Sequence, residues 1–245
     1  VEDAGASFVS AGIVGSAWIR IATDVEPYTD VRVRQALNLA LDVETIAQSL
    51  VSTAAHRLAS IHPDARSMGF DPELAPYAYD PDRARALLAE AGLDDGIDAV
   101  LETTTAAPQA VAEAMIAQWA EVGIRVSLQT SDYAAFNATW ADPAAPALRF
   151  ATWSPLYDPH TLLSLVFAGD GYLSRYGNAE ADRLIAAAGV EPDTETRAAL
   201  YRELARVLHE DAAAVFLWNL VATYGVVPAA SQWEPRGDEY VLPLG

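Results

Sequence analysis

One stretch of the chain, residues 151–167 (ATWSPLYDPHTLLSLVF), gathers side chains that could do chemistry. Trp153, Tyr157, Asp158 and His160 stand close together there, and an apolar segment follows them. Such a group is compatible with a catalytic site, a metal site, a wall on which a ligand stacks, or a loop that caps a helix. The rest of the sequence decides between these interpretations.

The spacing of these residues does not support nucleophilic catalysis. Ser154 and His160 share one loop, but the chain has no G-x-S-x-G turn that would expose a serine nucleophile. The absence of cysteine removes thiol catalysis, disulfides and cysteine-ligated metal sites. The sequence therefore indicates no catalytic residues and favours a protein that is not an enzyme.

The four histidines do not form a metal-binding pattern either. His56, His62, His160 and His209 show neither H-x-x-x-H nor H-E-x-x-H spacing, and the carboxylates are scattered along the chain. No glycine-rich phosphate-binding loop is present. The sequence therefore predicts no protein metal ligand and no cofactor.

Composition narrows the class of partner. The 245 residues carry a formal net charge of −19, and all 15 basic residues are arginine. This balance argues against nucleic acid as a partner, because phosphate binding needs clustered basic side chains. A hydrophobic content of 52% indicates a folded globular chain. No apolar run of about 18 residues could span a membrane, and the first residues lack the pattern of a signal peptide. We therefore expect either a cytoplasmic protein or one whose natural start lies upstream.

Hydrophobic periodicity predicts strands that alternate with helices. This pattern is typical of an α/β lobe in which helices cover one mixed sheet, and ligands of such sheets meet the loops beyond the carboxyl ends of strands. The loop after 147–153 lies in such a place. The predicted strands are two short runs within 8–23, then 97–102, 124–130, 147–153, 214–219 and 221–227. The predicted helices are 31–41, 43–51, 81–91, 107–122, 132–140, 159–167, 178–188 and 194–210, with a long ordered loop over 53–79.

Two readings of the opening stretch remain after this step. In the first, Asp158 caps the helix that begins at Pro159, as Asp30 and Asp80 are predicted to cap earlier helices, and the aromatic side chains pack on the sheet. In the second, Trp153 and Tyr157 form a stacking wall in a ligand cleft. Spacing alone leaves both open.

Several stretches, taken in order, resemble one family. The chain is similar to the extracellular solute-binding proteins of ABC importers, family 5, which includes oligopeptide-, dipeptide- and nickel-binding members. The stretches are PYTDVRVRQALNLALD, YDPDRARALLAEAGL, EVGIRVSLQTSDYAAF, TWSPLYDPH and ETRAALYRELARVLHEDAAAVFLW. The resemblance covers the C-terminal half of such proteins. It implies a fold of the periplasmic-binding-protein type (type II, large cluster C form).

The resemblance also implies a division of the chain and a set of partners. Residues 1–28 would be hinge strands, 29–212 the C-terminal closing lobe, and 213–245 strands and a tail that return toward an N-terminal lobe. The protein would be a monomeric extracytoplasmic receptor that captures a small-molecule solute between two lobes. It would be anchored as a lipoprotein through its N-terminal part and would deliver the solute to a permease and ATPase complex. Some relatives of such receptors act as sensors or chaperones, so the resemblance leaves that role open as an alternative for this chain.

The loop TWSPLYDPH resembles the nickel-binding branch most, where its Trp and Tyr reach the cleft. By that resemblance Trp153 and Tyr157 are ligand-wall residues, and Asp158 shapes the loop. Peptide-binding relatives place an Asp three residues after the Trp, and this chain has Leu156 there. The resemblance thus favours a metal chelate or a compact peptide-like molecule, with a plain di- or oligopeptide as the alternative.

Three further residues are predicted ligand contacts on the same basis. Nickel-binding relatives bring a histidine from the loop after this helix, but residues 167–177 (FAGDGYLSRYG) contain none, and Asp170 is the candidate in its place. Arg236 and Asp238 of the tail are predicted to return to the cleft rim, as in relatives.

Overall fold

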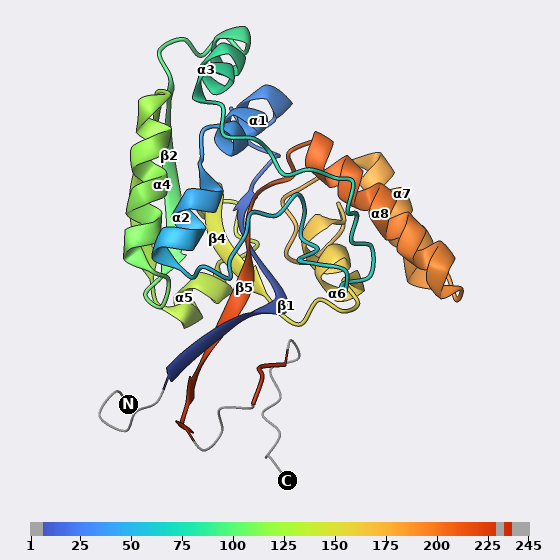
Figure 1. Cartoon of the computed structure of the whole chain (residues 1–245). Coiled ribbons are helices and arrows are strands. Elements are labelled where there is room, and N and C mark those ends of the chain that lie inside the picture. The colour runs from blue at the N-terminus through green and yellow to red at the C-terminus, as the bar shows by residue number, and fades with distance from the viewer. Residues whose placement is uncertain (1–6, 229–232, 237–245) are drawn as a thin grey trace.

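A mixed five-stranded sheet forms the centre of the protein. The computed structural model describes residues 7–228 and 233–236. The strand order is β3–β2–β4–β1–β5 (Figure 1). The strands are β1 (Ser7–Ile21), β2 (Ile97–Thr104), β3 (Ile124–Ser131), β4 (Leu148–Trp153) and β5 (Ala214–Val226). β2 runs parallel to β3 and β4, whereas β1 is antiparallel to β4 and β5. The carboxyl ends of β2 to β5 therefore lie at one edge of the sheet, as the α/β prediction requires.

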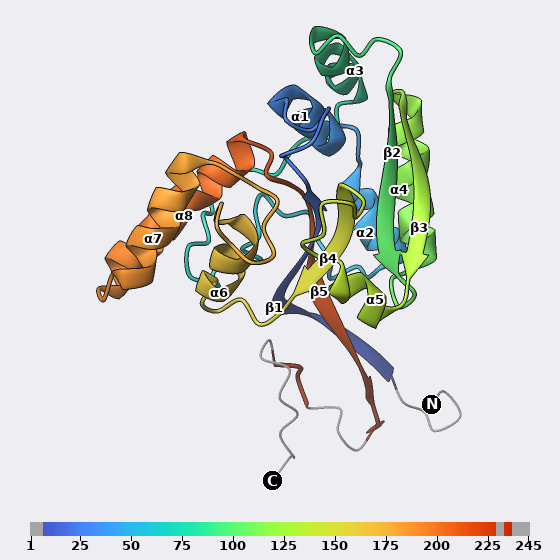
Figure 2. The ribbon, with the colours of Figure 1, turned by 180° about the vertical axis from the view of Figure 1, so that it is seen from behind.

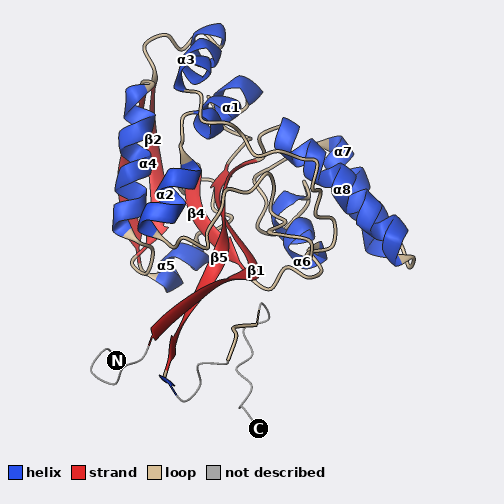
Figure 3. Cartoon of the chain, viewed as in Figure 1, coloured by secondary structure: helices blue, strands red, loops and turns tan. Residues whose placement is uncertain are grey.

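Helices lie on both faces of this sheet, but no helix of the described residues lies on the face of β2 and β3 opposite α4, as the two opposite views show (Figures 1 and 2). One layer contains α2 and α4, and the other contains α6, α7 and α8 (Figure 3). The short α5 lies at the edge where β2 and β4 end. The helices are α1 (Val31–Leu39), α2 (Val43–Leu50), α3 (Pro81–Glu90), α4 (Gln109–Glu121), α5 (Tyr133–Ala138), α6 (His160–Leu162), the π-helix η2 (Leu163–Phe167), α7 (Ala179–Val190) and α8 (Thr194–Glu210).

The central strand β1 divides the hydrophobic core into two clusters. Ile19 and Ile21 join the cluster beneath α1, α2 and α4, whereas Val14 and Trp18 join the cluster beneath α6, α7 and α8. Successive side chains of a strand point to opposite faces, so this alternation follows directly from the sequence of β1.

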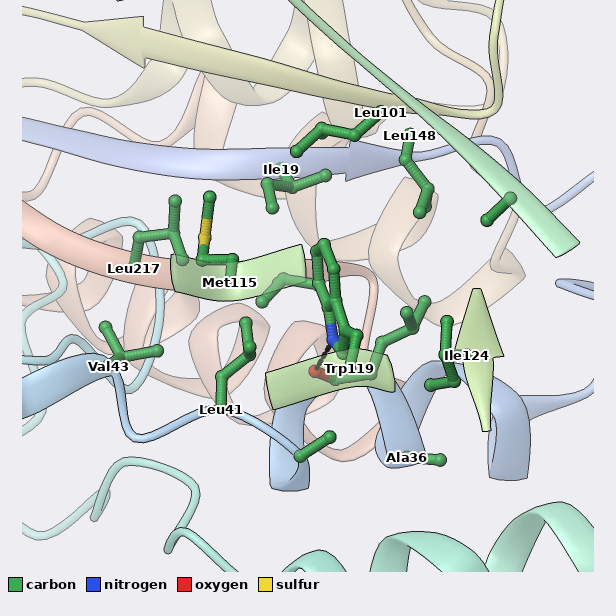
Figure 4. Close-up of a cluster of buried hydrophobic side chains, with 14 of the residues drawn as sticks. Ile19, Ala36, Leu41, Val43, Leu101, Met115, Trp119, Ile124, Leu148 and Leu217 are labelled. Atoms are coloured by element: carbon green, nitrogen blue, oxygen red, sulfur yellow. Dashed lines mark hydrogen bonds between the residues drawn. The ribbon is translucent and has the colours of Figure 1, made fainter. Parts of the chain in front are cut away.

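Trp119 of α4 anchors the first cluster (Figure 4). Its side chain is fully buried, and its indole N–H donates to the carbonyl oxygen of Leu37 over 3.0 Å. Met115, Leu101 and Leu148 lie around it in the same cluster. A buried indole needs a partner for its N–H, and this bond ties α4 to α1.

The predicted helix starts at Asp30 and Asp80 are confirmed. The Asp30 side chain accepts from the N–H of Arg32, and the Asp80 side chain accepts from the N–H of Arg83. Each bond satisfies a backbone donor that the first turn of a helix leaves free. The prediction of a long loop between α2 and α3 is also confirmed, because this segment contributes only an isolated bridge between Arg57 and Trp218 to the sheet.

The prediction of two short strands within 8–23 is wrong, and so is the prediction of separate strands over 214–219 and 221–227. β1 and β5 are each continuous, and they pair along most of their length. Shifts of register between Gly12 and Ser16 and between Ser16 and Trp18 accommodate the glycine-containing segment, so the pairing resumes beyond it. Glycine in a strand can mark a bulge, as here, and does not have to end the strand.

The predicted helix over 159–167 is only partly correct. One turn of α-helix, α6, continues as the π-helix η2. The N–H of Ala168 bonds the carbonyl of Leu163 over 3.0 Å, and the Ser164 hydroxyl donates to the carbonyl of His160 over 2.8 Å. A serine that bonds back to the preceding turn competes with the regular helical pattern.

No helix in the described part of the chain is long and apolar enough to cross a membrane. The division at residues 28 and 212 stays a prediction. Within the described residues, β1 and β5 belong to the same sheet as β2, β3 and β4.

Candidate functional site

A pocket of about 700 Å³ opens at the sheet edge where the parallel strands end. β2 and β4 pair at Leu101 with Leu148 and at Glu102 with Arg149. The pocket is lined by residues that follow these pairs, namely Thr104 from β2 and the end of β4 up to Trp153. Its volume is typical of a site for a small molecule. The carboxyl edge of an α/β sheet is also the place where ligands usually bind.

Seven of the 19 described lining residues of the pocket are aromatic, and they come from four elements. They are Trp18 of β1, Trp218 of β5, Phe150 and Trp153 of β4, and Tyr133, Phe136 and Trp140 from α5 and the residues that follow it. Thr104, Asn137, Thr152 and the Tyr133 hydroxyl supply polar groups of the lining, and none of the described lining residues carries a charge. Such a wall can bury flat apolar surface and offers few hydrogen-bonding groups.

A buried ion pair lies behind this wall. Arg149 of β4 and Glu102 of β2 are 0% and 3% exposed, and Arg149 Nε lies 2.8 Å from Glu102 Oε2. The same guanidinium donates to the carbonyl oxygens of Phe136 and Thr139 over 2.6 and 2.8 Å. It also lies over the Phe136 ring at 4.1 Å. The ion pair thereby holds the C-terminal end of α5, which carries part of the pocket wall.

A second buried arginine fixes the residues that follow α5. Arg20 of β1 donates to the carbonyl oxygens of Trp140 and Pro146. Its guanidinium lies 5.5 Å from the centre of the Trp140 ring. Burial, with the nearby Arg149, lowers the pKa of Arg20 to about 9, which leaves it charged at neutral pH.

The loop after β4 is tied down by the long loop between α2 and α3. The Ser67 hydroxyl donates to the carbonyl oxygen of Leu156, and the N–H of Met68 donates to that of Tyr157 over 2.9 Å. Because the Ser67 hydroxyl is used as a donor, its oxygen accepts from Nδ1 of His62 over 3.2 Å. His62 is fully buried, and burial lowers its pKa to about 4.

The residues predicted as a site at the end of β4 and in the loop after it lie in different environments. Trp153 lines the pocket. Tyr157 is 39% exposed and is not among the lining residues. Asp158 accepts from the N–H of His160 over 3.0 Å and pairs with Arg197 at 3.0 Å. The prediction that Asp158 caps a helix beginning at Pro159 is wrong, because α6 begins at His160 and has no side-chain capping bond. Leu156, at the position where peptide binders carry an Asp, is buried in the second core cluster.

Asp170 lies at a separate, open hollow of about 520 Å³ between η2 and α7. His160, Ser164 and Asp182 line the same hollow. Asp182 already accepts from the N–H of Gly169 over 2.7 Å. No group of three or more potential metal-ligating residues occurs among the described residues. The structure therefore does not bring Asp170 together with Trp153.

The two tail residues fall at the end of the described chain. Arg236 belongs to the described segment 233–236, and this segment lies against β5 through a contact between the rings of Trp233 and Tyr224, whose centres are 5.0 Å apart. Asp238 lies outside the described residues.

Most of the pocket wall was not identified as a site from the sequence. The helical spacing of Tyr133, Phe136 and Trp140 does place them on one side, and this signal could have suggested a ligand-facing surface. Trp18 and Trp218 gave no such signal. They look like ordinary strand residues, and only the register of β1 with β5 brings them to the same edge.

Comparison with known proteins agrees with this architecture. The family model for bacterial extracellular solute-binding proteins, family 5 Middle, matches residues 2–174. The heme-binding protein A of Haemophilus influenzae is 29% identical over 206 residues, which are 80% of this chain and 38% of that protein. The dipeptide-binding protein of Escherichia coli is 27% identical over 204 residues, which are 78% of this chain and 38% of that protein.

Two solved structures show the same fold over less than half of their length. HbpA2 from Haemophilus parasuis superposes with a TM-score of 0.81 at 25% identity, over 93% of this chain and 46% of that one. DppA from Helicobacter pylori, in complex with the peptide STSA, superposes with a TM-score of 0.79 at 23% identity, over 90% of this chain and 44% of that one. The family whose model matches this chain is one of solute-binding proteins. The chain belongs to the bacterial extracellular solute-binding proteins of family 5.

Proposed function

We propose that this chain is the closing lobe of the receptor of an ABC importer, and that it captures a small solute in the aromatic pocket. The observation that carries the proposal is the place of this pocket. It opens at the carboxyl edge of the sheet, and the paired ends of β1 and β5 extend beyond the same edge (Figure 1). A second lobe joined through these strands would cover the pocket, and closure of two lobes around a ligand is a known way to bind small molecules.

The solute that we favour is a metal chelate or a compact peptide-like molecule. Leu156 supports this choice, because its buried apolar side chain offers no carboxylate to the ammonium group of a peptide. A plain di- or oligopeptide is the alternative, and it is supported by relatives named for dipeptide and murein peptide binding. Nickel is one candidate metal, although residues 167–177 contain no histidine.

The ligand contacts that we propose come from the pocket and its surroundings. Trp153 would stack on the solute from the pocket wall. Tyr157, Asp158, Asp170, Arg236 and Asp238 are the further contacts that we propose. Tyr157, Asp158, Asp170 and Arg236 are described residues that do not line the pocket, so their contacts would be with parts of the solute that extend beyond it. The receptor would be a lipid-anchored monomer outside the cytoplasm and would pass the solute to a permease and ATPase complex.

The test uses the protein at its full natural length, purified from its own host. Mass spectrometry and metal analysis are expected to find a bound small solute, and X-ray scattering is expected to show a more compact particle with the solute than without it. Turnover of ester or peptide substrates would instead favour an enzyme. A gene neighbourhood without permease and ATPase genes would favour a sensor or chaperone.

Replacing Trp153 with alanine is expected to weaken solute binding by at least about fivefold while the fold remains intact. The reason is that an aromatic face is worth roughly 1 kcal/mol or more to a stacked ligand. Calorimetry gives the affinity, and circular dichroism checks the fold. Tyr79→Ala, which removes a partly exposed ring of the loop before α3, is the control. Wild-type affinity in Trp153→Ala would remove the stacking role, and Tyr157→Ala tests the predicted second wall residue in the same way.

The chain of 245 residues on its own is expected to bind the same solute at least about 100-fold more weakly than the full-length protein. The pocket is open on the side where the second lobe would lie, so a solute bound to one lobe keeps much of its surface in water. Calorimetry on both forms, with the solute identified above, measures the ratio. Equal affinities would contradict binding between two lobes.

A further inference from the structure

The rings of the pocket wall have positive charge behind them. Arg149 lies 4.1 Å from the centre of the Phe136 ring and 5.3 Å from that of the Trp140 ring, and Arg20 lies 5.5 Å from that of Trp140. Both arginines are buried, and neither lines the pocket. As seen from the pocket, the guanidinium groups therefore lie behind the rings.

These buried charges do not cancel. Glu102 neutralises Arg149, and Asp24 pairs with Arg175 at 2.8 Å. Arg20 instead bonds the carbonyl oxygens of Trp140 and Pro146. Two further arginines and two carboxylates act on the pKa of Arg20, and with Arg20 itself these five groups sum to one positive charge.

This arrangement decides what the pocket can hold. An aromatic wall would ordinarily attract a cation, because the face of each ring is electron-rich. Here the nearest rings already face a buried cation, and a second cation in the pocket would be repelled by Arg20 across a region of low dielectric constant. No described lining residue supplies a carboxylate to compensate. A bare anion is also disfavoured, because it would lose its hydration and gain no charged donor from the lining.

We propose that the aromatic pocket holds an uncharged, flat aromatic part of the solute and excludes cationic groups, including the ammonium end of a peptide. This proposal rests on the proposed function of the pocket as the solute site. Thr104, Thr152 and Asn137 are the side chains that would hydrogen-bond polar atoms at the edge of the bound group. Charged parts of the same solute would have to lie outside this pocket.

A matched pair of small probes tests the charge preference on the full-length protein without its solute. Quinoline is neutral near pH 7, and N-methylquinolinium has the same two fused rings with a fixed positive charge. Calorimetry and ligand-detected NMR are expected to give quinoline an affinity at least about tenfold higher. Loss of quinoline binding in Trp153→Ala is expected to place the probe in this pocket.

A second variant keeps the test independent of the buried arginines, whose replacement could unfold the lobe. Asn137 is exposed at the pocket, so Asn137→Asp adds a carboxylate there with almost no change of shape. We expect the ratio of the N-methylquinolinium affinity to the quinoline affinity to rise about tenfold in this variant. Ala138→Asp adds the same charge at the next position, which is exposed but does not line the pocket, and is expected to change neither affinity.

Two outcomes would overturn the proposal. One is equal or tighter binding of N-methylquinolinium to the wild-type pocket. The other is binding of neither probe at millimolar concentration. Both leave the proposed function standing if the full-length protein still closes on its own solute, so the two failures are distinguishable.

Discussion

Replacing Arg149 with methionine is expected to lower the free energy of unfolding by about 3–5 kcal/mol, because it leaves the carboxylate of Glu102 buried without its partner. The end of α5 also loses the donors that its carbonyl groups accept from Arg149. Urea unfolding followed by circular dichroism measures the change. The double variant Glu102→Leu with Arg149→Met removes both charges, and we expect it to lie closer to the wild type than Arg149→Met does.

A matched control comes from the exposed ion pair between Arg125 and Asp98, whose side chains are 53% and 82% exposed. Arg125→Met removes the same kind of partner from a solvated site, and we expect little change in the unfolding midpoint. If Arg149→Met were no more destabilising than Arg125→Met, the buried pair would not support α5 as described. Loss of quinoline binding without loss of stability would point instead to a local shift of the pocket wall.

Acidification is expected to destabilise the lobe by about 3 kcal/mol through His62 alone. Burial lowers the pKa of this histidine from 6.5 to about 4 in the folded state. The unfolded chain therefore takes up the proton first. Stability from this group is complete above pH 6.5 and is lost as the pH falls toward about 4, at about 1.4 kcal/mol for each unit of pKa difference.

A pair of variants separates this effect from the general response of an acidic chain to pH. His62→Gln cannot take up the proton, so the difference in unfolding free energy between it and the wild type is expected to shrink by about 3 kcal/mol across this pH range. The neighbouring Ile61→Val removes one buried methyl group and no titrating group, and its difference from the wild type is expected to stay constant. A constant difference for His62→Gln as well would show that His62 does not titrate in this way.

The sequence was sufficient for most of the helices and for the positions of β2, β3 and β4 along the chain, because their signals are local. Asp30 and Asp80 begin helices through bonds to residues two or three positions away, and α8 spans the predicted 194–210. The continuity of β1 was not predictable in the same way. It depends on pairing with β5, about 200 residues further along the chain, and no local pattern reports such a pairing.

The same distinction applies to the candidate site. Trp153 was identified because it belongs to a local stretch whose order resembles a known family. The buried pair of Arg149 and Glu102 was missed, because each residue lies in a strand-forming segment where an outward-facing charge would be ordinary. Only the parallel pairing of β2 with β4 brings these two residues opposite each other. A pocket made by several elements is therefore visible mainly after the chain is folded.

In the proposed two-lobe receptor, the long ribbon of β1 and β5 would do more than connect the two lobes. Its paired strands run past the pocket edge and then continue through the sheet, where they carry Trp18 and Trp218. Ser16 lies between the two register shifts and pairs with Trp153 on one side and Asn219 on the other. A rotation of the lobe that bends the ribbon at this irregular point would therefore also move Trp153 and the neighbouring aromatic side chains of the pocket. The strands at which the lobe would rotate and the strands that contact the solute would be the same two strands, β1 and β5.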